Sequence, residues 1–304
     1  MLVVSEITEN LEEFAILMLK RNIDIKPKLL NIVELDKKRR TTQSNLDNLL
    51  SESNQIAKKV GELYKNGDMQ KAEIFKEKAA SLKKESKEIS ELLNKIAFDL
   101  KALLLDVPNV PNKLVPNGNS DSDNEEILSG GSIPKLHKNA TPHWDLASKY
   151  DIIDFELGNK ISGAGFPVYK DKGAKLQRAL INYFLDKNIN AGYKEIQVPV
   201  LVNEDSGMGT GNLPDKEGQM YYVNEDNLYL VPTAEVPVTN VYRNTIVSSE
   251  ELPICLTSYT PCFRREAGSY GSHVRGLNRL HQFDKVEIVR IENPNNSYKA
   301  LDEM

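Results

Sequence analysis

Charged residues stand at the end of an apolar, strand-like segment of this sequence. Residues 256–264 alternate between apolar and polar types, and Arg265 and Glu266 follow Arg264 directly. After a glycine-rich stretch, residues 280–291 alternate in the same way. Two such segments predict a β-hairpin with a long loop. The first strand of that hairpin would end in a cluster of fixed charge.

The side chains of this hairpin could build a nucleotide site beside an amine site. An arginine fixed on a strand, such as Arg264, can bind a phosphate through paired N–H groups, and Arg279 adds a second positive charge. Phe283 offers a ring on which a base can stack. Glu266 and Glu287 can accept hydrogen bonds from amino groups. Surface ion pairs on an ordinary hairpin would use the same residues, so chemistry alone leaves both interpretations open.

Helical and strand-like segments precede the hairpin. Residues 172–188 place apolar side chains on one face of a helix. Short β-like segments follow at residues 193–202, 220–223 and 228–231, separated by turn residues. Few connections are long enough for a crossover helix, which favours antiparallel pairing. The second part of the chain is therefore predicted to be an α+β domain, a mostly antiparallel sheet flanked by helices.

Two glycine-rich segments, residues 163–165 and 207–211, raise the alternative of a dinucleotide-binding fold. Neither completes the GxGxxG pattern between a strand and a helix, and no acidic residue stands at the expected distance. We interpret both segments as loops.

The first third of the sequence has a different pattern. Apolar residues recur at steps of three and four along residues 35–63, and again along residues 75–103. This spacing is typical of a coiled-coil seam. The intervening Lys-Asn-Gly-Asp at residues 65–68 suits a reversal of direction. The sequence predicts an antiparallel two-helix arm, each helix about 50 Å long, which we expect to project from the rest of the protein.

The predicted arm is basic, although the whole chain carries a net charge of −5. Residues 36–101 contain 15 Lys and Arg against 11 Asp and Glu. Basic clusters stand at residues 37–40, 58–59 and 83–84. A solvated coiled-coil surface would account for them, and so would contact with a phosphate backbone. Charge alone does not decide between the two.

Residues 106–130 are rich in Pro, Asn, Asp, Ser and Gly and predict a linker. We place the domain boundary near residue 112, which gives a helical domain over residues 1–112 and a second domain over residues 113–304.

The composition is ordinary for a soluble globular protein, with 40% hydrophobic and 27% charged residues. The two cysteines, Cys255 and Cys262, form neither a disulfide framework nor a metal-binding pattern. The sequence shows no signal peptide and no run of about 20 apolar residues that could cross a bilayer. We expect a cytoplasmic protein with no membrane segment.

Several stretches of the chain resemble the seryl-tRNA synthetases, a family of class II aminoacyl-tRNA synthetases. Motif 2 of that family resembles CFRREAGSYG and the following RGLNRLHQFDKVE, and motif 1 resembles INAGYKEIQVPVLV. A loop before the family's active site resembles GTGNLPDKEGQMY, and its serine-binding segment resembles LVPTAEVPVTN. The helical arm matches in position, length and basic first helix. The implied fold is a coiled-coil arm joined to a class II synthetase-like antiparallel sheet flanked by helices.

The resemblance implies an ATP site on the hairpin. Arg264, the implied catalytic residue, would hold the α-phosphate, and Arg279 would neutralise the phosphate tail. Glu266 would contact the adenine amino group, and Phe283 would stack beneath the ring. The main chain at Leu280, where the family usually has valine, would line the adenine pocket. The implied ATP-binding residues are Arg264, Arg265, Glu266, Arg279, Leu280 and Phe283.

The resemblance also implies a serine site. The implied residues are Thr233, Ala234, Glu235 and Glu287. Glu235 would pair with the ammonium of serine, and Glu287 would reach its hydroxyl. The motif 2 loop, residues 267–276, would approach the acceptor end of the tRNA. Residues 272–275, Ser-His-Val-Arg, depart from the usual pattern of the family, which more often has an acid and a threonine before the arginine.

The implied function is that of a serine–tRNA ligase. L-serine and ATP would give seryl-adenylate, and the seryl group would pass to the 3′ end of tRNA(Ser). Mg²⁺ would accompany ATP, with no metal-binding residue assigned in this chain. The tRNA would bind the helical arm and the motif 2 loop, and motif 1 would form a homodimer interface. A short synthetase-like paralogue that binds tRNA or protein is the alternative.

Motif 3 of the family would lie beyond Met304. We therefore expect the catalytic domain to be incomplete at its C-terminal end and this chain alone to have little activity.

Overall fold

The computed structural model describes residues 2–266 and 275–304. Contacts divide the chain into two compact units, Met1–Ser132 and Ile133–Met304. The first unit extends past the helical arm because Lys20 Nζ donates hydrogen bonds to the carbonyl oxygens of Lys113 and Val115, at 2.5 and 2.6 Å. The domain boundary near residue 112 stays a prediction.

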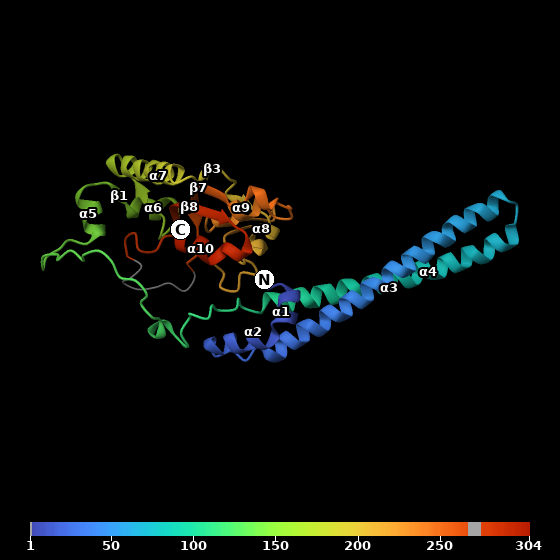
Figure 1. The fold of residues 1–304 in the computed structure, drawn as a ribbon. Helices are drawn as coiled ribbons and strands as arrows, with labels where there is room; N and C mark the ends of the chain where they lie inside the picture. The colour runs from blue at the N-terminus through green and yellow to red at the C-terminus, as the bar shows by residue number, and fades with distance from the viewer. Residues whose placement is uncertain (1, 267–274) are drawn as a thin grey trace. The chain divides into compact units, whose positions relative to one another are not determined.

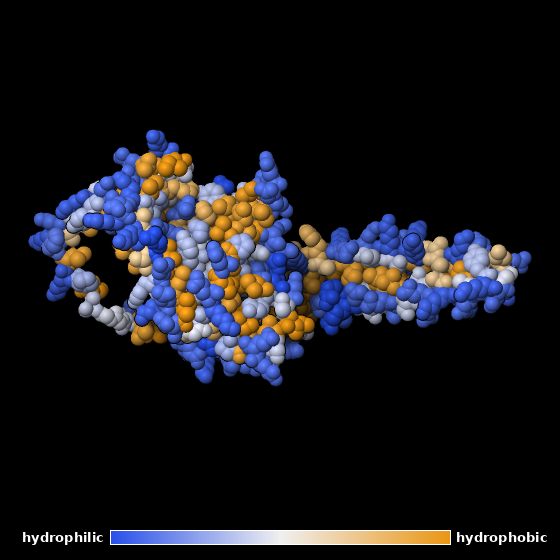
Figure 2. Space-filling view, turned by 90° about the horizontal axis from the view of Figure 1, so that it is seen from above, coloured by the Kyte–Doolittle hydropathy of each residue, from blue (hydrophilic) through white to orange (hydrophobic). Residues whose placement is uncertain are grey.

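The first unit contains the predicted coiled-coil arm. Its helices α3 (Lys26–Lys65) and α4 (Met69–Leu105) run antiparallel over 40 and 37 residues (Figure 1). Gly67 makes the turn between them with a φ of +78°, a backbone conformation that glycine adopts readily. Leu46, Ile56 and Leu82 are buried along the seam. Figure 2 shows hydrophobic residues where the two helices meet and hydrophilic residues along their outer sides. The prediction of this arm is confirmed.

Short helices close the base of the arm. They are α1 (Val4–Glu9), α2 (Leu11–Met18) and the 3₁₀ turn η1 (Leu19–Arg21). A further 3₁₀ turn, η2 (Asp121–Asp123), lies in the predicted linker. The base has its own apolar core, because both arm helices and the short helices contribute buried residues to it. These residues are Ile7, Met18, Ile25, Leu29, Ile32, Leu100 and Val107.

The second unit is built on the predicted hairpin. Strands β7 (Ile254–Phe263) and β8 (Gln282–Ile291) pair antiparallel over their full length. Strand β3 (Lys194–Glu195) joins the other edge of β7 in the parallel direction, so that the sheet order is β3-β7-β8. Helix α7 (Lys172–Asn190), which was predicted over residues 172–188, contacts β7 and β8. The α+β prediction is confirmed.

A second sheet and a short ladder hold the other strands described in this unit. Strands β4 (Leu201–Val202), β6 (Leu228–Leu230) and β5 (Tyr222–Val223) pair antiparallel in the order β4-β6-β5. Strands β1 (Ile153–Asp154) and β2 (Val168–Tyr169) form the ladder.

The single strand predicted at residues 193–202 is wrong. This segment divides into β3 and β4, which belong to different sheets. Pro199 lies between them, and proline has no N–H to donate to a continuous ladder. The division lets one segment serve both the hairpin sheet and the smaller sheet.

Further short helices lie between and after the strands. They are α5 (His143–Lys149), α6 (Phe155–Ile161), α8 (Glu204–Gly209), α9 (Glu235–Asn240), η3 (Ser249–Glu251), η5 (Pro294–Asn296) and α10 (Ser297–Glu303). Within the described residues, none of the helices combines the length and the apolar character needed to cross a membrane.

Candidate active site

Arg264 is fixed at the end of β7. Its guanidinium carbon lies 5.1 Å from the centroid of the Phe283 ring, a distance at which a cation is attracted to a ring face. Its main-chain N–H donates to the carbonyl of His281 at 2.9 Å, and its Nε donates to the carbonyl of Pro232 at 3.3 Å. Nε–H is only one of five guanidinium donors. The side chain is therefore positioned by the protein while retaining donors for a ligand.

Glu266 and Arg279 form an ion pair across the base of the hairpin loop. The Glu266 Oε2 atom lies 3.2 Å from Arg279 Nε, and the Glu266 side chain is largely buried. The φ of Glu266 is +47°, which is uncommon for a residue other than glycine. The pair brings together the residue before and a residue after the segment 267–274. That segment, which includes most of the predicted tRNA-contacting loop, lies outside the described residues.

The neighbouring arginine faces elsewhere. Arg265 is exposed, and its guanidinium carbon lies 6.0 Å from the ring centroid of Tyr221. Its main-chain N–H donates to Gln219 at 2.8 Å. The structure brings Arg264 and Phe283 together but places Arg265 against residues 219–221. The assignment of Arg265 to ATP stays a prediction.

His281, whose carbonyl accepts the main-chain hydrogen bond of Arg264, packs against two neighbouring segments. Its Nδ1 lies 2.7 Å from the Tyr221 hydroxyl, and its ring stacks on Phe166 at a centroid distance of 5.3 Å. Gly165 has a φ of +84°, and a Cβ there would lie 2.4 Å from the imidazole Cδ2 of His281. Because glycine has no Cβ, residues 163–166 can pack closely against the hairpin at His281. This contact explains a segment that sequence analysis could only describe as a loop.

Two of the predicted serine-binding residues meet directly. Thr233 is buried, and its hydroxyl donates to Glu287 Oε2 at 2.5 Å. The main-chain N–H of Glu235 donates to the same oxygen at 3.0 Å, while the Glu235 side chain is exposed at the start of α9. Ala234 is fully buried in an apolar cluster with Val238. Its methyl group packs in that cluster, and the assignment of Ala234 to serine stays a prediction.

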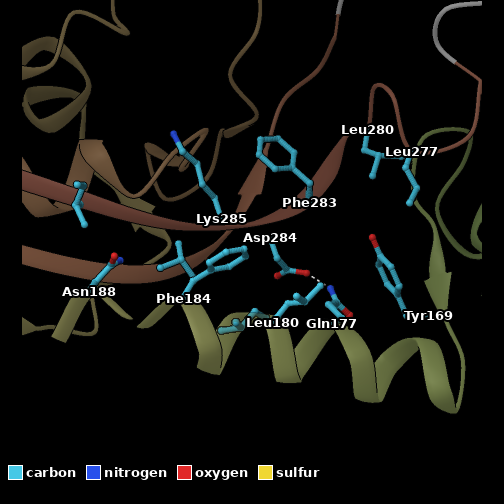
Figure 3. Close-up of a pocket in the computed structure, with 13 residues that line it drawn as sticks. Tyr169, Gln177, Leu180, Phe184, Asn188, Leu277, Leu280, Phe283, Asp284 and Lys285 are labelled. Atoms are coloured by element: carbon cyan, nitrogen blue, oxygen red, sulfur yellow. Dashed lines mark hydrogen bonds between the residues drawn. The ribbon is translucent and has the colours of Figure 1, made fainter. Parts of the chain in front are cut away.

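Sequence analysis missed Lys285, which completes this arrangement. Lys285 Nζ donates to Thr233 Oγ1 at 3.0 Å and to Glu287 Oε1 at 2.8 Å. Figure 3 shows Phe283 and Lys285 on one side of β8 and Asp284 on the side that faces α7. The signal was available in the sequence, because residues two apart on a strand share a face. Lys285 lies between Phe283 and Glu287 in that alternation.

A pocket of about 590 Å³ runs along β8 toward α7 (Figure 3). It is lined by apolar side chains and a few polar ones: Tyr169, Gln177, Leu180, Ile181, Phe184, Asn188, Leu277, Leu280, Phe283, Asp284, Lys285, Val286 and Ile288. The predicted adenine-site residues Leu280 and Phe283 are among them, and Leu280 is buried. The size and mixed lining suit a small-molecule site, but the pocket lies on the α7 side of β8, opposite the side on which Phe283 and Lys285 project (Figure 3).

The α7 side of this pocket holds a polar cluster around Asp284. The Tyr259 hydroxyl donates to Asp284 at 2.5 Å, and Gln177 donates to its other oxygen. Burial and then the bond to Asp284 raise the pKa of Tyr259 well above its ordinary range. Burial, with a smaller effect of Asp284, also raises the pKa of Tyr169. The Tyr259 phenol therefore stays protonated even at alkaline pH and donates its hydrogen bond to Asp284.

A second cavity, of about 610 Å³, lies beside the described base of the hairpin loop. Arg275 covers the Trp144 ring with its guanidinium carbon 5.0 Å from the ring centroid. The Leu277 N–H donates to Nε2 of His143 at 2.8 Å. These contacts attach the loop base to α5. Among the described residues, no group of three or more His, Cys, Asp and Glu side chains is placed to hold a metal ion.

Two protein families match parts of the chain. The family described as "Seryl-tRNA synthetase N-terminal domain" matches residues 1–111. The family described as "tRNA synthetase class II core domain (G, H, P, S and T)" matches residues 220–304, which include the hairpin.

Curated relatives and a solved structure match most of the chain. A serine–tRNA ligase of Salinibacter ruber is 44% identical over 89% of this chain, which spans 63% of that protein. A serine–tRNA ligase of Chlorobium phaeobacteroides is 40% identical over 100% of this chain, which spans 71% of that protein. A crystal structure of seryl-tRNA synthetase from Pyrococcus horikoshii complexed with ATP superposes with a TM-score of 0.81 and 27% identity, over 100% of this chain and 72% of that one.

Proposed function

This chain belongs to the seryl-tRNA synthetase family, and from that premise we propose that it serves the activation of L-serine by ATP and the transfer of serine to tRNA(Ser). In the first step, the serine carboxylate attacks the α-phosphate of ATP, and pyrophosphate leaves. In the second, a ribose hydroxyl at the 3′ end of the tRNA takes the seryl group and AMP leaves. A protein of this kind would work in the cytoplasm.

The proposed nucleotide site lies around Arg264. Negative charge grows on the α-phosphate as the carboxylate attacks, and a positioned guanidinium stabilises that charge. Phe283 stacks the adenine on the ring face away from Arg264, and the main chain at Leu280 forms the pocket wall. Glu266 accepts a hydrogen bond from the adenine amino group, and Arg279 neutralises the outer phosphates. Arg265, which is exposed, is the last of the proposed ATP-binding residues.

The proposed serine site is adjacent to it. Glu287 is oriented by Thr233 and by the Glu235 N–H, which leaves its carboxylate prepared to receive the substrate. Glu235 contributes its side chain to the ammonium of serine, whose three N–H groups can donate to Glu287 as well, and Ala234 contributes its main chain. A buried acceptor that is left unpaired without the serine hydroxyl would disfavour alanine. The Thr233–Glu287 contact beside the fixed Arg264 is the observation that carries the proposal.

No protein nucleophile is needed in this scheme, because both attacking oxygens belong to substrates. Catalysis then comes from positioning and from charge stabilisation. Mg²⁺ is proposed to enter with ATP, and it would neutralise phosphate charge. Because Mg²⁺ in nucleotide sites is held largely by the phosphates and one or two carboxylates, a cluster of protein ligands is not required. We assign no residue of this chain to it.

The helical arm is proposed to bind tRNA. Its basic clusters are only partly neutralised within the arm: Asp36 binds both Arg39 and Arg40 at 2.9 Å, and Glu34 binds Lys38 at 2.7 Å. Arg275, at the described end of the motif 2 loop, is proposed to reach the acceptor end as well. A few such cations contacting phosphates release counterions and supply affinity.

A homodimer is proposed through motif 1. Helix α7, which leads into that motif at Ile189, exposes Leu176, Tyr183 and Ile189 besides the pocket residues Leu180 and Phe184. An apolar surface of this extent on one helix suits a protein interface. Light scattering coupled to size exclusion would report the oligomeric state directly.

Two measurements test the proposed function. The binding of ATP and of L-serine by the folded chain can be followed by calorimetry, which does not require turnover. Serine-dependent exchange of pyrophosphate into ATP tests the chemistry, with threonine and alanine as control substrates, and we expect this chain alone to show little exchange. A folded chain that binds neither ATP nor serine would contradict the proposal.

A further inference from the structure

A lysine ammonium occupies the centre of the proposed serine site. Lys285 Nζ bridges Thr233 Oγ1 and Glu287 Oε1, while the Thr233 hydroxyl bonds to Glu287 Oε2, which closes a ring of three hydrogen bonds. The Glu287 side chain is 16% exposed and the Lys285 side chain 34% exposed. An ion pair on the surface would be more exposed than this one and would contribute little to the free energy of folding.

This ring leaves Glu287 with few free acceptor positions. Oε2 accepts from Thr233 and from the Glu235 N–H, and Oε1 accepts from Lys285. An amino acid whose ammonium is to bind Glu287 must therefore share or take the place of the Lys285 ammonium. The two groups are chemically equivalent as donors, since each is an –NH₃⁺ with three N–H bonds.

An amino acid also brings a carboxylate, attached to the carbon that bears its ammonium. When the substrate ammonium binds Glu287, its carboxylate arrives within a few ångströms, and a displaced lysine ammonium is the matching counter-charge. The flexible stem of lysine allows that movement. Arg264 already contacts Pro232, the residue before Thr233, so two cations would border the place where the carboxylate meets the α-phosphate.

We propose that Lys285 is a substrate-binding residue that holds the carboxylate of L-serine after yielding its place on Glu287 to the ammonium of the substrate. The inference rests on the proposed function. It adds to that function a residue that brings two anions, the serine carboxylate and the nucleotide phosphate, close enough to react.

The alternative role for Lys285 is to orient Glu287 and nothing more. The two roles differ in what they do to a substrate without a carboxylate. L-serinamide retains the ammonium and the hydroxyl of serine but replaces the carboxylate by a neutral amide. A carboxylate-binding lysine favours serine over serinamide, whereas a lysine that only orients Glu287 affects both ligands equally.

The experiment compares the affinities of L-serine and L-serinamide for the wild-type chain and for Lys285→Met and Lys285→Arg, by calorimetry or ligand-observed NMR. We expect the wild type to favour serine by about tenfold, the size of a hydrogen bond to a charged group. Lys285→Met should abolish that preference, and Lys285→Arg should retain most of it. Lys299→Met, which removes an exposed lysine paired with Glu303, is the matched control.

Thermal melting establishes that each variant is folded, and Lys285→Gln replaces the methionine variant if that one unfolds early. Equal weakening of both ligands, or a preference for serine that survives in Lys285→Met, would overturn the inference and leave the proposed function standing. A folded wild type that binds ATP but neither serine nor serinamide would contradict the proposed serine site together with the inference.

Discussion

The guanidinium of Arg264 lies over the ring of Phe283, so that the end of β7 and the beginning of β8 form one binding surface. The register aligns Cys262 with Phe283, and Arg264, two residues beyond Cys262, falls on the same face of the hairpin as that ring. A charge and a ring held together by a strand pair need little reorganisation when a ligand arrives. This relationship suits the hairpin to the binding of an adenine nucleotide.

Arg264→Ala should weaken ATP binding by about tenfold or more, because it removes hydrogen bonds to a charged ligand. Calorimetric titration of ATP measures the change. Arg178→Ala, which removes an exposed arginine of α7, is the control and should leave ATP affinity unchanged. Equal ATP affinity in the wild type and Arg264→Ala would remove Arg264 from the proposed site.

Thr233→Val should weaken serine binding and leave ATP binding nearly unchanged. The variant keeps the shape of the side chain but leaves Glu287 Oε2 without its shortest hydrogen bond. Oε2 keeps the Glu235 N–H, and the lost hydrogen bond to a charged group costs about 1.5–3 kcal/mol, which also lowers the free energy of unfolding. Serine titration and urea unfolding measure the two effects. Thr245→Val, at an exposed position, is the control and should change neither serine affinity nor the free energy of unfolding. If Thr233→Val also changed neither quantity, the Thr233–Glu287 hydrogen bond would have no role.

Gly165→Ala should destabilise the protein more than Gly211→Ala. Both glycines have similar positive φ angles, +84° and +77°, so both variants carry backbone strain of about 1 kcal/mol. Only at Gly165 would the added Cβ meet a side chain, 2.4 Å from His281, and the overlap should add about 1–3 kcal/mol. Urea unfolding compares them. Equal losses would mean that the contact between residues 163–166 and the hairpin is not tight.

The Gly165→Ala variant should also weaken ATP binding. The carbonyl of His281 accepts the main-chain hydrogen bond of Arg264, so that a displaced His281 moves the guanidinium as well. Gly211→Ala, which contacts nothing within 4 Å, should bind ATP normally.

Cys255 should react with a thiol reagent in the folded protein well before Cys262 does. Cys262 is fully buried, and its burial raises the pKa of its thiol, so that less of the reactive thiolate is present at a given pH. Cys255 is only partly buried. Mass spectrometry after brief labelling at pH 8 locates the modified residue. Prompt labelling of Cys262 without urea would show that β7 opens readily.

The sequence predicted those features that depend on neighbours along the chain. The coiled-coil arm follows from steps of three and four residues and a turn at Gly67, and the hairpin follows from two alternating segments. The strand at residues 193–202 was wrong because alternation continues past Pro199, while hydrogen bonding to one sheet does not. Pairing between distant strands, rather than local pattern, decided where that segment divides.

What the sequence determined by itself about the site was a list of residue types, and the tertiary structure decided which of them meet. Arg264 and Arg265 are indistinguishable as letters, but only Arg264 lies on Phe283. Alternation along β8 puts Lys285 on the same face as Phe283 and Glu287. Its contact with Thr233, however, joins two distant segments, and no local pattern could show it. The physical reason is that side-chain contacts across a sheet depend on register and on what covers each face, and both are set only when distant segments pack together.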